Sequence, residues 1–399
     1  MIRRLVALLL ASLLSSQVLG CTTEEAPQLC VSLLDVGQGD SLLIELPGGE
    51  HWLVDGGGVA GGGGSVGLRV LLPELRRRGI RRVDKLMVTH ADADHFEGLF
   101  AVVGVIDIGE FWTPTRSGGA RFRRLLRTLE RAGTKMVFLD EGETSLRAAP
   151  GVDVELLHPL KSWRDTRGPR ASKNDNSIVF SLGYGQVDFL FTGDIEKEVE
   201  EWLLATNRLA DFEVLKLAHH GSKTSSSPAF IRAVRPLVAM AGAAAGNQHH
   251  FPHSSVVARL LKQGGAVFSS ARHGSVQVCT DGWDLRVVQR DRGRLQGHLR
   301  AWSAAEILAR GRIVQARGSV PTSVVELPTQ DRSRKRGIGR SSLGVRGSPG
   351  SRGLRGSNTK RKRSSVPRET AGFPESEVLI DDRTWSRRRK ARNRFRPGW

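Results

Sequence analysis

Short apolar stretches separated by polar or glycine-rich turns run through most of the chain and predict strands that alternate with helices. Near the N-terminus, residues Val31–Leu34, Ser41–Leu46 and Trp52–Val54 have strand character and lie between glycine-containing turns. The apolar run at 83–89 predicts a buried strand. The segment "ARFRRLLRTLERAG" at 120–133 has the spacing of an amphipathic helix.

The same alternation continues toward the C-terminus. A helix is expected over 68–80, with Pro73 in its first turn, and another over 96–106. The later part of the pattern gives a strand, a helix and two more strands, at 237–242, 254–264, 266–270 and 275–282. Strands interleaved with helices over residues 28–300 favour a layered α/β domain.

The composition changes after Gln296. Of the formal net charge of +19, about 16 units fall in residues 301–399, which hold 24 Lys and Arg against 8 Asp and Glu. This stretch is rich in Arg, Gly, Ser and Pro and poor in apolar residues, so we expect a disordered basic tail. An inert solvated tail and a tail that binds nucleic acid or an acidic polymer both fit this composition.

The first residues, "MIRRLVALLLASLLSSQVLGC", have the pattern of an export signal. Arg3 and Arg4 precede a short apolar run, Leu5–Leu14, which is too short to span a bilayer comfortably. The ending "VLGC" resembles a bacterial lipoprotein signal over 1–21, in which Cys21 becomes the lipidated first residue; an ordinary signal peptide cut nearby is the alternative. Either reading predicts an exported protein of the periplasm or cell envelope.

Two further cysteines, Cys30 and Cys279, lie in strand-like stretches. Export permits a disulfide between them. Two buried free thiols fit the sequence equally well.

Four side chains that favour metal ions follow the strand expected at 83–89. His90, Asp92, Asp94 and His95 fall within the six positions "HADADH". A lone His or Asp at a strand end is usually a polar cap, but four together would repel one another and lose hydration. Imidazole and carboxylate together suit zinc, manganese or iron.

More His and Asp residues, which can bind metal ions, occur at other expected strand ends. They are Asp194 after "FLF", His219 and His220 after "LKLA", and His249, His250 and His253 in "NQHHFPHSS". Since ligands gather at the carboxyl ends of strands in α/β sheets, we expect several of these side chains to converge.

The motif from His90 to His95 resembles the H-x-[HD]-x-D-H signature of the metallo-β-lactamase superfamily. Together with "DVGQGDS", "LVDGG", "NDNSIVF", "FTGD" and "LAHHGS", in that order, it is similar to the soluble hydrolase domain of ComEC-type DNA-uptake proteins. The resemblance covers about residues 29–290. It implies a four-layer αββα sandwich with two divalent metal ions, zinc or manganese, between the sheets.

The resemblance also implies the ligands: His90 and Asp92 for the first ion, Asp94 and His95 for the second, Asp194 as the bridge, and His219, in preference to His220, to complete a shell. It makes Asp94 and His253 the candidate catalytic residues, with His253 binding metal or the leaving group. Where many members of the superfamily have a histidine, this chain has Asn174 and Asn176. Because Asn binds metal poorly, the first site should be weaker or shaped by another group.

Other polar residues near these motifs have two readings each. His220, Ser222, Lys223 and Asn176 are candidates for substrate contacts, with a solvated loop as the alternative for Ser222 and Lys223. In "DVGQGDS", Asp35, Gln38 and Asp40 either support the metal ligands or form a turn. Asp55 ends a strand near the expected site.

Two metal ions that lower the pKa of a water molecule serve hydrolysis of phosphodiesters, thioesters or amides. The resemblance favours a phosphodiesterase or nuclease with nucleic acid as substrate. An ester or amide hydrolase of the same fold remains an alternative. So does an exported, non-catalytic protein that binds DNA or an anionic polymer through its tail.

Overall fold

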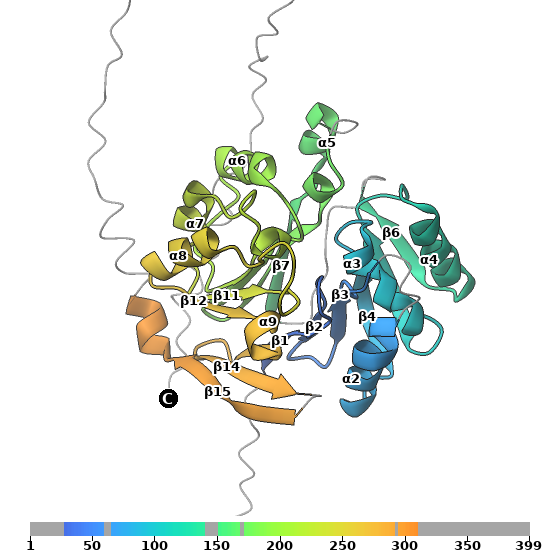
Figure 1. The fold of residues 1–399 in the computed structure, drawn as a ribbon, viewed down its shortest axis with the longest axis horizontal. Coiled ribbons are helices and arrows are strands. Elements are labelled where there is room, and N and C mark those ends of the chain that lie inside the picture. Colours follow the sequence, from blue (N-terminus) through green and yellow to red (C-terminus); the bar gives the residue numbers. More distant parts are fainter. Residues whose placement is uncertain (1–27, 60–64, 140–150, 168–170, 292–293, 310–399) are drawn as a thin grey trace, which may run out of the picture. The chain divides into compact units, whose positions relative to one another are not determined.

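A computed structural model describes residues 28–59, 65–139, 151–167, 171–291 and 294–309 (Figure 1). The predicted signal peptide with Cys21, and nearly all of the predicted tail, lie outside the described residues. Among the described residues, no helix combines the length and the apolar character needed to cross a membrane.

Two β-sheets carry the architecture, and their strands alternate buried side chains between two faces. The larger sheet has the strand order β15-β14-β13-β1-β2-β3-β4-β5-β6. In chain order its strands are β1 (Leu29–Leu33), β2 (Leu42–Glu45), β3 (His51–Val54), β4 (Arg82–Met87), β5 (Asp107–Thr113), β6 (Lys135–Phe138), β13 (Ser275–Thr280), β14 (Leu285–Asp291) and β15 (Arg294–Trp302).

The smaller sheet has the order β12-β11-β10-β9-β8-β7. Its strands are β7 (Val152–His158), β8 (Val179–Tyr184), β9 (Val187–Phe191), β10 (Val214–Lys216), β11 (Val238–Ala241) and β12 (Ala266–Ser269). Strands β9 to β12 are mutually parallel, as are β3 to β6 in the larger sheet, so several strand ends point the same way in each sheet.

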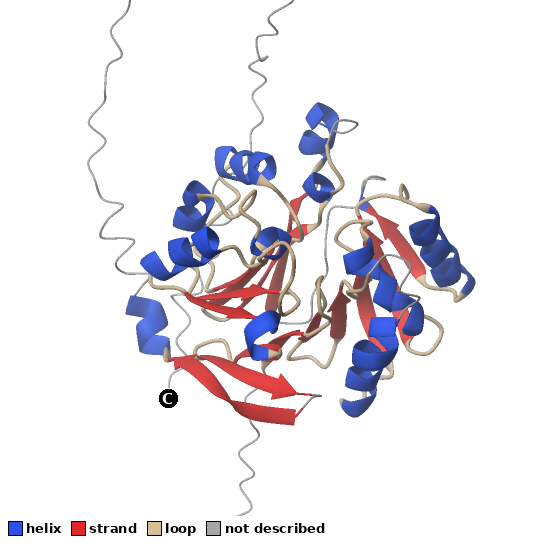
Figure 2. Cartoon of the chain, viewed as in Figure 1, coloured by secondary structure: helices blue, strands red, loops and turns tan. Residues whose placement is uncertain are grey.

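Helices cover the outer face of each sheet (Figure 2). The larger sheet packs against α2 (Leu72–Arg77), α4 (Ala120–Arg131), the π-helical turn Gly67–Leu71 and the 3₁₀ turn Glu97–Ala101, which follows α3 (Ala93–Phe96). The smaller sheet packs against α6 (Lys197–Ala205), α7 (Pro228–Val234) and α8 (Ser254–Lys262). Two further short α-helices in the described residues are α5 (Lys161–Arg167) and α9 (Ser270–His273).

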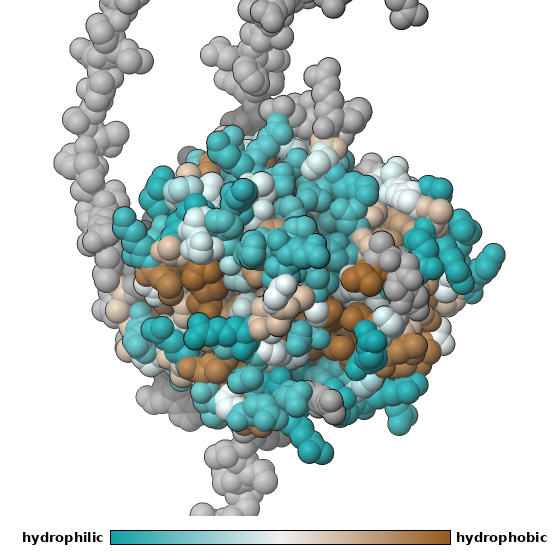
Figure 3. Space-filling view, viewed as in Figure 1, coloured by the Kyte–Doolittle hydropathy of each residue, from teal (hydrophilic) through white to brown (hydrophobic). Residues whose placement is uncertain are grey.

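The central core lies between the sheets. Val31 and Trp52 of the larger sheet share a buried cluster with Phe180, Phe191 and Met240 of the smaller one. Each sheet also has a second cluster of buried apolar residues on its other face, between the sheet and its helices. The described residues therefore form the four layers expected from the sequence, helix–sheet–sheet–helix. On the face shown in Figure 3, hydrophobic side chains appear in separate groups among polar ones.

Most expected elements are present, with local differences. Pro73 lies in the first turn of α2, as predicted. The helix expected over 96–106 is shorter, because helical turns end at Ala101.

The pairing of β1 with β13 places Cys30 opposite Cys279, and the two form a disulfide rather than two free thiols. The fold also continues beyond residue 300, where the sequence placed the start of the tail. β15 ends at Trp302, and both Trp302 and Ile307 are buried in the central core.

Candidate metal centre

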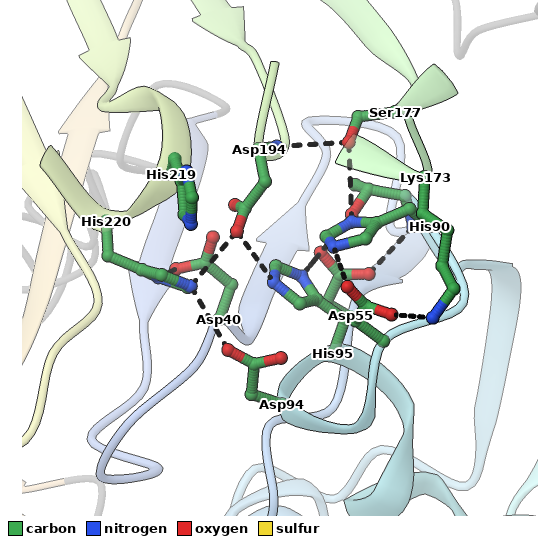
Figure 4. A network of polar contacts seen from close by, with 12 residues as sticks. Asp40, Asp55, His90, Asp94, His95, Lys173, Ser177, Asp194, His219 and His220 are labelled. Carbon is green, nitrogen blue, oxygen red and sulfur yellow. Dashed lines mark hydrogen bonds and ion pairs between the residues drawn. The ribbon is translucent and has the colours of Figure 1, made fainter. Parts of the chain in front are cut away.

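The candidate centre lies where strands of both sheets end (Figure 4). The segment His90–His95 follows β4 in the larger sheet. Asp194 follows β9, and His219 and His220 follow β10, in the smaller sheet. Because their backbones are fixed by packed strands, these side chains meet without a large loop having to order them.

Four buried side chains form its middle: Asp40, His95, Asp194 and His220, whose ligand atoms lie within 4.8 Å of one another. The Oδ2 atom of Asp194 is 3.3 Å from Nε2 of His95 and 3.2 Å from Nε2 of His220. Asp194 thus stands between the two imidazoles.

Three more of the expected ligands flank this middle. Oδ2 of Asp94 is 3.4 Å from Nε2 of His220. The ring of His90 packs at 4.1 Å from that of His95, and its Nε2 is 3.7 Å from Oδ2 of Asp92.

Several polar atoms of the centre are buried and make no hydrogen bond. They are Nε2 of His90, His95 and His220, and Oδ1 of Asp194. The three ring nitrogens among them have only charged contacts, at 3.2–3.7 Å from carboxylate oxygens. Four such buried atoms at one place, all good donors to divalent cations, fit a bound metal ion well.

The opposite ring nitrogens of the histidines are held by other groups. Nδ1 of His95 is 2.8 Å from Oδ2 of Asp55, which also accepts a 2.8 Å hydrogen bond from Oγ1 of Thr89. Nδ1 of His220 is 3.3 Å from Oδ1 of Asp40, whose other oxygen pairs with the buried amine of Lys216. Metal-binding histidines usually have such a partner, which fixes the tautomer and leaves Nε2 for the metal.

His90 has neutral partners instead. Its Nδ1 lies 3.1 Å from Oγ1 of Thr89 and 3.3 Å from Oγ of Ser177. The Ser177 hydroxyl also accepts a 3.1 Å hydrogen bond from the backbone N–H of Asp194. Ser177 therefore links the β4 and β9 sides of the centre.

The charges in the centre shift the ionisation of its groups. Burial alone would lower the pKa of His95, but Asp194 and Asp55 raise it well above its usual value. Burial likewise opposes protonation of His220, yet Asp194 and Asp40 raise its pKa well above normal. Burial would raise the pKa of Asp194, but His220 and His95 hold it well below the usual range.

His90 behaves differently, since burial lowers its pKa to about 3, helped by the nearby charge of His95. A neutral His90 and an ionised Asp194 are ready to bind a cation. Protons on His95 and His220 would be released when a metal replaces them.

The structure brings His220, and not His219, to Asp94 and Asp194. Nδ1 of His219 instead lies 3.2 Å from Oε1 of Glu196. Both histidines have positive φ, 49° and 55°, in a tight turn after β10 that sends their side chains in different directions.

The remaining candidate residues contact groups other than the proposed ligands. The side chain of His253 caps α8 and contacts Oγ of Ser255 at 2.8 Å, while its backbone N–H donates to Gly221 O. Oγ of Ser222 is 2.9 Å from Oγ1 of Thr224, Lys223 is exposed, and Nδ2 of Asn176 donates to Ser172 O.

The "DVGQGDS" turn packs against the segment His90–His95. Gly39 has φ +118°, and a Cβ there would lie 2.1 Å from the carbonyl oxygen of Asp94. The next residue, Asp40, donates its N–H to that same oxygen. Glycine is therefore required for Asp40 to reach His220. Asp35 is exposed and bonds within its own turn.

Sequence reasoning left out Lys216, Glu196, Thr89 and Ser177. A buried Lys within an apolar strand, as in "LKLA", was the one available signal for Lys216. The other three contact the centre only because the fold brings distant segments together, and no sequence motif marks them.

Beside the centre lies a cleft of about 200 Å³. His90 and Ala91 form the wall that it shares with the centre. Its other walls come from the end of β5 with the segment after it, and from the segment before β8: Thr113, Pro114, Thr115, Ser117, Gly118, Ala171, Lys173 and Asn176.

Comparison with known proteins identifies the family. Three curated proteins are similar: ComE operon protein 3 of Bacillus subtilis (28% identical), Recombination protein 2 of Haemophilus influenzae (33%) and Competence protein ComA of Neisseria gonorrhoeae (31%). The alignments cover 62%, 63% and 69% of this chain and 32%, 29% and 35% of those proteins, so the chain spans about a third of their length. Residues 34–243 match the sequence profile of the metallo-beta-lactamase superfamily, and the chain belongs to this family.

Proposed function

We propose that the protein is a metal-dependent hydrolase of phosphodiesters and that nucleic acid is its substrate. One observation carries the proposal: buried ring nitrogens of three histidines and one oxygen of Asp194 converge without hydrogen-bond partners at the strand ends of a metallo-β-lactamase-family domain.

The ligands fall into two groups. His90 contacts Asp92 in one group, while the other group holds His95, together with Asp94 and His220, which contact each other. Asp194 contacts both His95 and His220. We assign the two groups to two divalent ions, zinc or manganese, bridged by Asp194. His220 takes the place for which the sequence favoured His219.

Divalent ions bound by these residues would lower the pKa of a water molecule toward neutrality and neutralise charge on the phosphate oxygens. The chain itself supplies orientation, since Asp55 and Asp40 fix the rings of His95 and His220. The burial of all three rings excludes bulk water from that side. The carboxylate of Asp94 is 34% exposed, so it is open to a substrate.

One feature favours a phosphate-containing substrate, and a second favours nucleic acid in particular. The exposed amine of Lys173 lies 2.6 Å from Oδ1 of Asp92, at the edge of the centre, where a phosphate would be attracted. The curated relatives carry names that refer to competence and recombination, which concern DNA.

The test uses the purified full chain, stripped of metal and reloaded with zinc or manganese. We expect cleavage of single-stranded DNA and of bis(p-nitrophenyl) phosphate, and no cleavage by the stripped protein. Loaded protein that cleaves p-nitrophenyl acetate but neither phosphodiester would favour the ester hydrolase instead. Binding of DNA without any hydrolysis would favour a non-catalytic role.

Attachment to the cell envelope through a lipid on Cys21 is a further part of the proposal. It rests on the sequence of residues 1–21 alone.

A further inference from the structure

The cleft beside His90 has walls from two segments that are far apart in the sequence. One wall comes from the end of β5 with the segment after it and the other precedes β8, so the cleft spans the two halves of the domain. We infer that this cleft is a subsite for one nucleoside, with the base inside and the adjoining phosphate held at the metal centre. The inference rests on the proposed phosphodiesterase function.

The size of the cleft limits what can enter. Pockets that enclose a whole drug-sized ligand usually have about 300–1,000 Å³. At about 200 Å³, the cleft is too small for such a ligand and suits one ring-sized group attached to a larger molecule. A polynucleotide offers such a group next to every phosphodiester.

The chemistry of the walls fits a base rather than a purely apolar ring. Pro114, Ala91 and Ala171 supply apolar contact for the faces of a ring. Hydroxyl groups on the same walls, such as those of Thr113 and Thr115, can donate or accept hydrogen bonds at its edge. Because a hydroxyl serves either role, the subsite should accept all bases with little sequence preference.

The orientation follows from two residues that the cleft shares with the centre. His90 lines the cleft, and its Nε2 lies 3.7 Å from Oδ2 of Asp92, a proposed ligand. Lys173 lines the cleft too, and its amine reaches Asp92. A phosphate at the metals therefore lies at the mouth of the cleft, and its nucleoside extends inward between the two walls.

The experiment measures binding by calorimetry to the zinc-loaded full chain. The probes are thymidine 5′-monophosphate, 2-deoxyribose 5-phosphate, which lacks the base, and inorganic phosphate. We expect the nucleotide to bind at least about tenfold tighter than either of the other two. Thr115→Leu and Ala171→Leu each fill the cleft and should reduce this preference to about threefold or less, with phosphate affinity unchanged.

Thr128→Leu makes the same change on α4, away from the cleft, and should behave as the unmodified protein. Equal affinity of the unmodified protein for all three probes would overturn the subsite, as would full nucleotide preference in both filled variants. The comparison of probes decides the matter even if a filled variant does not fold.

Hydrolysis of bis(p-nitrophenyl) phosphate is measured in parallel. Its absence would remove the proposed function while the binding data still report on the cleft.

Discussion

At the scale of single residues, Asp194 is the side chain on which the centre depends most. It is buried, its backbone N–H is bonded to Ser177, and its carboxylate faces both His95 and His220. Asp92 contrasts with it, because its carboxylate is 35% exposed and contacts His90. The two aspartates therefore allow a matched test of the bridge.

We predict that Asp194→Ala lowers metal content at both sites and abolishes hydrolysis, whereas Asp92→Ala weakens one site preferentially. The fold should survive in both variants, because the strands are held by their apolar cores. Metal per chain by mass spectrometry is compared with circular dichroism and turnover. Full activity of Asp194→Ala, or fewer than one ion per chain in the loaded unmodified protein, would contradict the two-ion arrangement.

At the scale of elements, β15 and the residues after it complete the central core. Trp302 and Ile307 are each 5% exposed and pack between the sheets, although the surrounding strand "RLQGHLRAW" is mostly exposed. Trp283, in the turn between β13 and β14, is 39% exposed. The same substitution at both tryptophans therefore separates the effect of lost core packing on stability from the effect of losing a tryptophan side chain as such.

Trp302→Ala should lower the free energy of unfolding by about 3–5 kcal/mol, as for other large-to-small changes in cores. Trp283→Ala should change it by less than about 0.5 kcal/mol. Urea denaturation of both variants checks the difference. Equal losses would show that residues beyond 300 do not contribute to the core.

The sequence predicted the strands that end in His or Asp because buried strands leave a continuous apolar run, as before His90 and Asp194. It did not predict β14 and β15, since their Arg and Gln residues resemble those of the tail. Prediction of the disulfide would have required the register of β1 against β13. That register depends on contacts between residues far apart in the chain. The choice between His219 and His220 depends on the left-handed backbone conformation of both residues. Histidine at these positions does not by itself predict that conformation.

At the scale of the whole molecule, charge is divided unevenly along the chain. Residues 301–399 contribute about 16 of the 19 net positive charges, and nearly all of these residues lie outside the described part. The described domain is therefore close to neutral. Binding of polyanions by the tail and cleavage at the metal centre should be separable.

The full chain should bind single-stranded DNA with an affinity that falls steeply between about 50 and 200 mM salt, since each phosphate contact releases counterions. A chain that ends at residue 309, which retains Trp302 and Ile307, should lose most of this binding and keep its hydrolysis of bis(p-nitrophenyl) phosphate. Fluorescence anisotropy at several salt concentrations measures the slope. The same affinity and slope in both proteins would refute the assignment to the tail.

The position of β1 inside the larger sheet has a consequence for synthesis. β1 lies between β2 and β13. Cys30 of β1 forms the disulfide with Cys279 of β13, and the two cysteines are separated by 249 residues in the sequence. At about 5–20 residues per second, the ribosome needs roughly 12–50 seconds to add them. Throughout that time the emerging chain exposes one unpaired edge of its first strand, where pairing with another chain competes with completion of the sheet.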